Sequence, residues 1–333
     1  MRSHDNREDN RMPPITRRAA IGAALAAPLA RPTIAQERFP NRPITIQIGF
    51  PPGGATDVQM RAFADAATRH MGQTVLIENR PGAGSTLPAA NVARARPDGY
   101  LVGQLTLPAL RLPHMQRMPY DVTRDFTPVI HLTGYLFGVT VRNESPYQSW
   151  ADVVADAKRR PGQVRVGNTG ANGTPHLTMV ELAEKEGIEF IHVPFRGEGD
   201  LVPSLLGGHI EAGATGSGVG QLVDEGKLRF LNVWSRDRSP RWPNIPTLQE
   251  LGYRGMVVTS PYGLVGPAGM PAEIVRALHD GFKAALDDQT HIAALRRLDM
   301  PLEYLNSADY ARFMLETYEQ ERQRVERLGL RTG

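Results

Sequence analysis

The chain has 333 residues, of which 41% are apolar, and it contains no cysteine. This length suits about two ordinary domains, and the apolar fraction is too high for a disordered or collagen-like chain. Without cysteine the protein has no disulfide, no thiolate nucleophile, no iron–sulfur cluster and no cysteine-ligated zinc.

The net charge is small and unevenly distributed along the chain. The formal charge is +3, but residues 1–35 hold six arginines against three acidic residues, so 32 basic and 32 acidic residues remain beyond them. Binding to nucleic acids or to anionic membranes needs a clustered basic surplus. We therefore expect no nucleic-acid partner.

The first 35 residues have the features of an export signal. Arg17 and Arg18 precede a short apolar stretch that runs to Leu29, and small residues close the segment at Ala35. The stretch is well below the roughly 20 residues that a membrane-spanning helix needs. We expect a twin-arginine-like signal over residues 1–35, cleavage near Ala35 and a periplasmic mature protein. A disordered N-terminal tail is the alternative.

Beyond the leader, short β-rich runs alternate with helical patterns. In the first half we expect strands over 44–50, 75–78 and 100–106, with helices over 57–71 and 87–96. In the second half we expect helices over 150–160, 176–186 and 200–206, with strands over 164–168, 190–193, 210–214 and 228–234. This alternation predicts two α/β units with largely parallel sheets.

The C-terminal part is mainly helical. A strand-like piece over 256–265 precedes three helical patterns that run from Pro271 to the end, the last strongly charged. Helices with a solvated face usually cover a domain rather than form one. We therefore expect the chain to cross twice between two domains, one of residues 36–138 plus 256–333 and the other of residues 139–255.

Three glycine-rich loops follow predicted strands and open into helices. They are PPGGATD (51–57), RPGAGST (80–86) and TGANGTPH (169–176). Open α/β sheets bind ligands at this edge, and the free N–H groups at a helix start attract anions. Glycine permits the ligand to approach the backbone closely. The loops predict a carboxylate site; the alternative is ordinary tight turns, with helices capped by Asp57, Ser85 and Thr174.

Motifs of catalytic and cofactor sites are weak or absent. GAGST (82–86) lacks the third glycine of a dinucleotide fingerprint, and TGSGVG (215–220) has Thr215 where a nucleophile elbow has glycine. The nine histidines show no zinc-binding spacing. We therefore expect no cofactor and no metal. His176 is either an ordinary polar residue or cleft-facing, Arg196 is either a cleft donor or a surface residue, and Asp200 is expected to be an N-cap.

Ordered motifs continue along nearly the whole remaining chain. They are ENRPGAG (78–84), ARPDGY (95–100), MPYDVTRDFTPV (118–129), PHL (175–177), HVPFRG (192–197), LLGGHIE (205–211), EGKLR (225–229), RSPRWPNIPTLQELG (238–252) and GPAGMP (266–271). Together with PPGGATD, they make the chain resemble the extracytoplasmic solute-binding receptors of tripartite tricarboxylate transporters, the Bug proteins.

The resemblance implies a two-domain α/β periplasmic-binding-protein fold of the second type, with a ligand cleft between the domains. It also implies a monomer that is not an enzyme, a small organic carboxylate as ligand, and a membrane permease as partner. The ligand contacts implied by the family's motifs are Phe50, Gly53, Gly54, Ala55, Thr56, Asp57, Gly84, Ser85, Thr106, Gly170, Asn172, Gly173, Thr174, His176, Phe195, Arg196 and Gly197.

Two departures from the family pattern bear on the ligand. Relatives commonly show a Gly-Thr pair where this chain has Leu105 and Thr106, followed by Leu107 and Pro108, so we expect a more apolar wall. Residues 212–217 lack the acidic residue that relatives commonly carry there. This absence disfavours an amino-acid ligand and leaves room for a bulkier, even aromatic, carboxylate.

Two other functions stay open at this point. One is a secreted hydrolase of small esters or amides that uses a serine or histidine in the cleft. The other is a ligand sensor without a role in transport.

Overall fold

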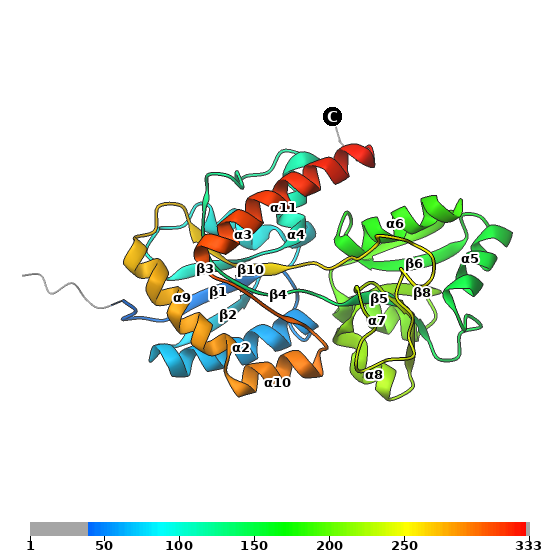
Figure 1. The fold of residues 1–333 in the computed structure, drawn as a ribbon, viewed down its shortest axis with the longest axis horizontal. Coiled ribbons are helices and arrows are strands. Elements are labelled where there is room, and N and C mark those ends of the chain that lie inside the picture. Colours follow the sequence, from blue (N-terminus) through cyan, green and yellow to red (C-terminus); the bar gives the residue numbers. More distant parts are fainter. Residues whose placement is uncertain (1–38, 331–333) are drawn as a thin grey trace, which may run out of the picture. The chain divides into compact units, whose positions relative to one another are not determined.

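The structure is a computed structural model that describes residues 39–330, so the predicted signal over 1–35 and its cleavage site lie outside the described residues. Two mixed β-sheets, each flanked by helices, form this part of the chain (Figure 1). We call the six-stranded sheet with its helices lobe 1 (39–133 and 262–330). The five-stranded sheet with its helices is lobe 2 (137–258).

The sheet of lobe 1 has the strand order β11-β4-β10-β3-β1-β2. Its strands are β1 (Ile44–Ile48), β2 (Val75–Asn79), β3 (Leu101–Leu105), β4 (Phe126–Thr133), β10 (Tyr262–Pro267) and β11 (Leu302–Leu305). β1 pairs in parallel with β2 and β3, whereas β10 is antiparallel to both of its neighbours. Ile44, Ile46 and Ile48 are all fully buried, as expected for a central strand between two helical layers.

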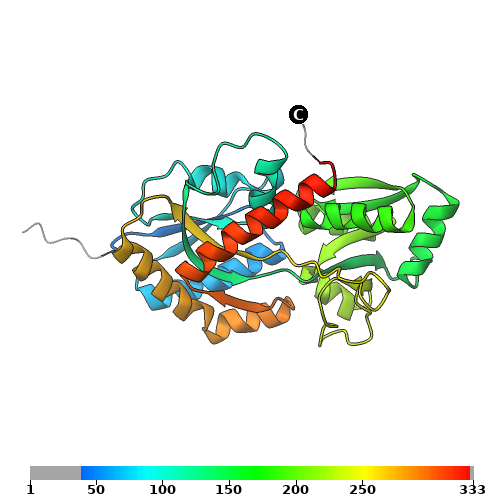
Figure 2. The same ribbon diagram turned by 45° about the horizontal axis from the view of Figure 1, so that its top comes forward.

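Helices cover both faces of this sheet (Figures 1 and 2). One face carries α2 (Ala55–Met71), α9 (Ala272–Leu286) and α10 (Gln289–Arg297), with Phe63 and Phe282 in their shared core. The other face carries α3 (Leu87–Val92), α4 (Leu107–Arg111) and α11 (Ser307–Arg327), packed through Leu105 and Tyr310. The chain's last helix therefore returns to lobe 1, which it covers.

The sheet of lobe 2 has the strand order β7-β6-β8-β5-β9. Its strands are β5 (Phe137–Arg142), β6 (Val164–Thr169), β7 (Phe190–Phe195), β8 (Ala212–Gly216) and β9 (Leu228–Val233). Its helices are α5 (Trp150–Arg159), α6 (Thr174–Glu186), α7 (Glu198–Leu206) and α8 (Gly220–Asp224). One core lies beneath α5 and α6 and contains Trp150 and Trp234, and a second beneath α7 contains Leu201 and Phe230.

Two short segments connect the lobes, residues 134–136 and 259–261. They run side by side, because Leu136 and Thr259 form an isolated antiparallel bridge. This double crossing explains why the prediction of largely parallel sheets is wrong. Each time the chain enters or leaves a lobe it adds an antiparallel strand, namely β5 in lobe 2 and β10 in lobe 1.

The strand predicted over 256–265 is displaced for the same reason. Met256 and Val258 pack into the core of lobe 2, so β10 begins only at Tyr262, after the chain has crossed. The short strand β11 and the short helix α4 were not predicted, because neither contains enough residues for a periodic pattern. Within residues 39–330, no helix combines the length and apolar character needed to cross a membrane.

Candidate functional site

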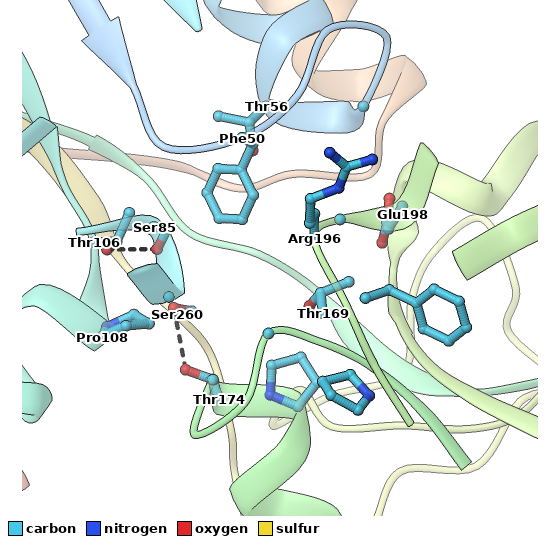
Figure 3. Close-up of a pocket in the computed structure, with 18 of the residues that line it drawn as sticks. Phe50, Thr56, Ser85, Thr106, Pro108, Thr169, Thr174, Arg196, Glu198 and Ser260 are labelled. Carbon is cyan, nitrogen blue, oxygen red and sulfur yellow. Dashed lines mark hydrogen bonds between the residues drawn. The ribbon is translucent and has the colours of Figure 1, made fainter. Parts of the chain in front are cut away.

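A cavity of about 270 Å³ lies between the two lobes (Figure 3). This is near the lower end of the roughly 300–1,000 Å³ found for ligand pockets, so it suits a small molecule. Both lobes line it, lobe 1 with residues after β1, β2 and β3 and lobe 2 with residues after β6 and β7. The cavity therefore lies at the carboxyl ends of strands of both sheets, where α/β folds bind ligands.

Most of the predicted contact residues meet at this cavity. Those that line it are Phe50, Gly54, Ala55, Thr56, Gly84, Ser85, Thr106, Gly170, Gly173, Thr174, Phe195, Arg196 and Gly197. Gly53, Asp57, Asn172 and His176 do not line it. These four lie directly behind the lining loops, and their hydrogen bonds show that they hold the loops in place.

The PPGG loop is held by Asp57 from behind. The Asp57 carboxylate accepts the Gly53 N–H at 2.9 Å and also pairs with Arg61 and Asn79. Burial opposes ionisation of Asp57, but the hydrogen bonds from these partners lower its pKa. Asp57 is therefore not the N-cap of α2. That position is Gly54, which has no side chain to cap the helix, so its first N–H groups stay available.

The TGANGTPH loop is held in the same way by two side chains. Asn172 has a φ of 59°, its N–H donates to Nδ1 of His176 at 3.2 Å, and its carbonyl accepts from Nη1 of Arg111 at 2.9 Å. Burial first, and then the charge of Arg111, lower the pKa of His176, which favours the neutral ring that this hydrogen bond needs. His176 thus faces its own loop, and Arg111 is a supporting residue that the sequence did not single out.

Hydroxyl groups from both lobes face the cavity. Ser85 and Thr106 share a hydrogen bond of 3.0 Å, and Thr174 of lobe 2 donates to Ser260 of the connecting segment at 3.4 Å. Neither Ser85 nor Thr174 is an N-cap, since the N-cap of α3 is Thr86 and that of α6 is Gly173. Among residues 39–330, no serine or threonine hydroxyl forms a hydrogen bond with a histidine side chain, and the two hydroxyl pairs at the cavity join serine to threonine.

Three longer helices begin at the cavity. Gly54 and Ala55 start α2, Gly173 and Thr174 start α6, and Gly197 starts α7, and all five residues line the space. The first N–H groups of a helix have no carbonyl partner inside the helix and carry its positive dipole end. Their convergence makes the cavity a favourable place for an anion.

Aromatic rings supply the apolar wall. Phe50, Tyr135, Phe137 and Phe195 line the cavity, and the rings of Phe50 and Tyr135 meet edge to face at 6.1 Å. The prediction that residues 105–108 make the wall more apolar is only partly right. Thr106 and Pro108 line the cavity, whereas Leu105 and Leu107 are buried in the core beneath α3 and α11.

Several lining residues were missed by the sequence analysis. Tyr135 joins the connecting segment to lobe 1, because its hydroxyl shares a hydrogen bond of 2.6 Å with Thr56 and accepts from Gln104 at 3.2 Å. Ser260 and Glu198 also line the cavity. No local pattern marks Tyr135 or Ser260, but Glu198 stands inside the HVPFRGEG run and could have been found there.

The structure shows where Arg196 and Asp200 lie. Arg196 lines the cavity, but its Nε donates to Asp200 at 2.9 Å and its side chain is 75% exposed. Asp200 is not an N-cap, because α7 begins two residues earlier, at Glu198. The part of the chain that the structure describes contains no group of three or more histidine or acidic side chains able to hold a metal ion.

Comparisons with known proteins agree with this architecture. The family described as "Tripartite tricarboxylate transporter family receptor" matches residues 59–330. A UPF0065 protein encoded in the gbd 5' region of Cupriavidus necator is 43% identical over 94% of this chain and 96% of its own length. Protein BugT of Bordetella pertussis is 30% identical over 83% of this chain and 86% of its own length.

Solved structures with the same fold include two with bound dicarboxylates. The periplasmic binding protein BugD superposes with a TM-score of 0.84 at 25% identity, over 89% of this chain and 100% of that one. MatC of Rhodopseudomonas palustris, solved with malate, gives 0.79 at 26% identity, over 86% and 99% of the two chains. R. palustris Rpa4515, solved with adipate, gives 0.81 at 27% identity, over 87% and 98%.

These findings establish the fold as a two-domain periplasmic-binding-protein fold with a cleft for its ligand. They also show that the relatives are solute-binding receptors and not enzymes. The chain belongs to the receptor family of the tripartite tricarboxylate transporters, which includes the Bug proteins.

Proposed function

We propose that this protein captures a small organic carboxylate in the cavity between its lobes and delivers it to the membrane components of a tripartite transporter. One observation carries the proposal: the starts of α2, α6 and α7 and the hydroxyls of Ser85, Thr106 and Thr174 converge on one cavity. Backbone N–H groups and hydroxyls can hold a carboxylate without a cationic side chain.

We assign the ligand contacts to the thirteen predicted residues that line the cavity. Gly53, Asp57, Asn172 and His176 are then supporting residues, because they contact the loops rather than the cavity. The malate and adipate bound by two structural relatives support a carboxylate as the ligand class. The identity of the bound acid is a question for the experiment below.

The mechanism that we propose is closure of the two lobes around the ligand. A molecule in the cavity contacts Phe50 and Ser85 from lobe 1 and Thr169 and Phe195 from lobe 2 at the same time. Such contacts exist together only in the closed form, so binding shifts the population toward closure. We propose that the two domains predicted from the sequence, residues 36–138 with 256–333 and residues 139–255, move as bodies. Their boundaries shift by a few residues to the paired segments at Leu136 and Thr259, which act as the hinge.

The location and the partner follow from the family. Receptors of this family are periplasmic, which supports export of this chain through residues 1–35 with cleavage near Ala35. The closed receptor then presents its ligand to a membrane permease, acting as a monomer. Loss of carboxylate uptake in cells that lack either the receptor or the permease is the expected result, and unchanged uptake in both would contradict the transport role.

The first test is a thermal-shift screen of residues 36–333 against dicarboxylates, tricarboxylates, aromatic carboxylates, ω-substituted monocarboxylates and neutral amides. A ligand at about 100 times its dissociation constant stabilises the folded state by roughly 2.7 kcal/mol, which raises the melting midpoint by several degrees. We expect a clear shift with one carboxylate class. No shift with any carboxylate, after unfolding and refolding to remove a bound ligand, would overturn the proposal.

A further inference from the structure

Glu198 is an acidic side chain in the wall of the cavity. It is the first residue of α7, and its carboxylate accepts a hydrogen bond from the N–H of Gly216 at the end of β8. A Cβ atom at Gly216 or at Gly218 would meet this carboxyl group. The two glycines therefore leave the space that Glu198 fills, and its carboxyl group has a defined position.

This carboxyl group has no cationic partner among residues 39–330. The nearest basic residue along the chain is Arg196, which pairs instead with the exposed Asp200. Burial raises the pKa of Glu198, and the hydrogen bond from Gly216 only partly offsets this effect. An unpaired carboxylate in such a place costs stability, and acidic groups of this kind gather at functional sites.

The acid and the hydroxyl groups lie on different sides of the cavity. Figure 3 shows Ser85, Thr106, Thr174 and Ser260 together on one side, while Glu198 lies on the other, beyond Thr169 and Arg196. Aromatic rings, including those of Phe50 and Phe195, line the space. A ligand whose carboxylate binds at the hydroxyl side would direct its other end toward Glu198.

The acid also stands where the sequence analysis expected none. Residues 212–217 contain no acidic side chain, and on that ground an amino-acid ligand was disfavoured. In the structure Glu198, from α7, lies against Gly216 in this very segment. That expectation considered residues 212–217 alone, whereas in the structure a carboxyl group from α7 lies against this segment and lines the cavity.

A purely structural role for Glu198 must be weighed. Acidic residues in the first turn of a helix stabilise it by interacting with the helix dipole. Asp200 already occupies the same first turn of α7 and is exposed, as such residues usually are. Glu198 turns instead toward another element and toward the cavity, which favours a role in ligand recognition.

We propose that Glu198 selects carboxylates whose far end carries a hydrogen-bond donor, an ammonium group above all and a hydroxyl or amide group next, and rejects a second carboxylate. The proposal rests on the function proposed above, since it assumes that a carboxylate binds at the hydroxyl side. The physical reason is that a donor pairs with the half-buried acid, whereas a second carboxylate would face a like charge.

The test measures dissociation constants by calorimetry for two series of ligands. One series is adipate, ω-aminohexanoate, ω-hydroxyhexanoate and hexanoate, and the other is succinate with its ω-amino, ω-hydroxy and unsubstituted counterparts of the same length. Within a series only the terminal group differs. In the unmodified protein, we expect the ω-amino acid to bind best, the ω-hydroxy acid second and the dicarboxylate worst.

The variant Glu198→Gln removes the charge and keeps the size of the side chain. It should weaken binding of the ω-amino acid by about tenfold to a hundredfold and strengthen binding of the dicarboxylate. The matched control is Glu184→Gln, which makes the same charge change at an exposed position of α6 and should leave both affinities unchanged. The ligand ranking in the unmodified protein needs no variant, so the test stands even if Glu198→Gln folds poorly.

The outcomes separate this inference from the proposed function. If the dicarboxylates bind the unmodified protein as tightly as the ω-amino acids, or if Glu198→Gln changes neither affinity, Glu198 is not a selector, while carboxylate capture stands. If no member of either series and no other carboxylate binds, capture itself is refuted and this inference falls with it.

Discussion

Nη1 of Arg111, in α4 of lobe 1, donates a hydrogen bond of 2.9 Å to the backbone carbonyl of Asn172 in lobe 2. The guanidinium is fully buried, and its Nε pairs with Glu321 of α11. The contact thus ties the loop before α6, which lines the cavity, to the helix that covers lobe 1. The ion pair supports the ligand site without touching the cavity.

The substitution Arg111→Met should therefore destabilise the protein and weaken carboxylate binding. Removing one member of a buried ion pair costs about 3–5 kcal/mol when the other charge is left unpaired. The loss should be smaller here, because Glu321 keeps a contact of 3.9 Å with Arg324. Urea unfolding measures this loss. The double variant Arg111→Met with Glu321→Met should recover part of the stability but not the affinity, because the Asn172 loop still lacks its anchor.

The control for Arg111 is Arg124→Met, at an exposed position whose side chain pairs with Asp121 on the surface. A surface ion pair contributes about 0–1 kcal/mol, so this variant should unfold close to the original urea midpoint. If Arg111→Met lowered the urea midpoint no more than Arg124→Met does, the supporting role of the Arg111–Glu321 pair would be refuted.

The substitution Gly54→Leu tests whether the ligand reaches the start of α2. Gly54 has a φ of −77°, and the only atom close to an added Cβ is the Pro51 carbonyl oxygen at 3.8 Å, so the variant should fold. Its side chain would keep a ligand from the free N–H groups. Each lost hydrogen bond costs about 1–3 kcal/mol, so we expect about tenfold to hundredfold weaker binding by calorimetry.

Gly199→Leu is the matched control for Gly54. Gly199 also has open space around an added Cβ, lies one turn or less inside α7 and does not line the cavity. It should bind the ligand as the unmodified protein does. Wild-type affinity in Gly54→Leu would mean that the ligand does not reach the start of α2.

Glu198→Gln should stabilise the ligand-free protein at neutral pH. Burial raises the pKa of Glu198 above its ordinary value of 4.5, so the folded state holds this proton more tightly than the unfolded state does. Stability is therefore lost as the pH rises from about 4.5 through the folded pKa. The charged or titratable groups nearby are Arg196, paired with Asp200, and Tyr135, whose raised pKa keeps it neutral.

The measurement is the melting midpoint of the two proteins from pH 4 to pH 8. Because glutamine does not titrate, the advantage of Glu198→Gln should be largest at the upper end and vanish below about pH 4.5. An advantage that is the same at every pH would show that the Glu198 charge is not the cause.

Acidification should destabilise lobe 2 through His192. Burial, and then the neighbouring His176, lower the pKa of His192 from 6.5 to about 4, and the two rings meet edge to face at 4.6 Å. Between about pH 4 and pH 6.5, the unfolded state therefore binds more protons than the folded state does. Stability contributed by the neutral ring is full above about pH 6.5 and is lost as the pH falls toward 4.

Urea unfolding at pH 7 and pH 5 checks this prediction. The unmodified protein should have a lower midpoint at pH 5, and His192→Gln should reduce the difference between the two midpoints. The other titratable groups around this pair are His176 itself and Arg111, which also lowers the pKa of His176. An equal pH dependence in His192→Gln would assign the effect to other groups.

The sequence was most informative where neighbouring residues decide the structure. The PPGG and TGANG loops follow buried strands and precede helices, and the structure places both at the cavity. Gly54 and Gly170 in these loops, and Gly84 in the RPGAGST loop, all line the cavity, and Gly84 and Gly170 have positive φ. The family resemblance likewise rested on short motifs in a fixed order.

The sequence was wrong or silent where distant residues decide the structure. Asp57, Thr174 and Asp200 stand in cap-like positions, yet the N-caps of α2, α6 and α7 are the earlier glycines Gly54, Gly173 and Gly197, which line the cavity. The mixed sheets follow from the double crossing between lobes, which no local pattern of strands and helices reveals.

The sequence by itself determined that this is an α/β protein of the transporter-receptor family with glycine-rich loops that open into helices. Only the tertiary structure showed that Arg111 anchors the loop at Asn172 and that Glu198 reaches Gly216. Helix starts and turns depend on a few adjacent residues, whereas burial and pairing of a charge depend on residues brought together from distant parts of the chain. The ligand selectivity that we propose for the cavity depends on residues from distant parts of the chain.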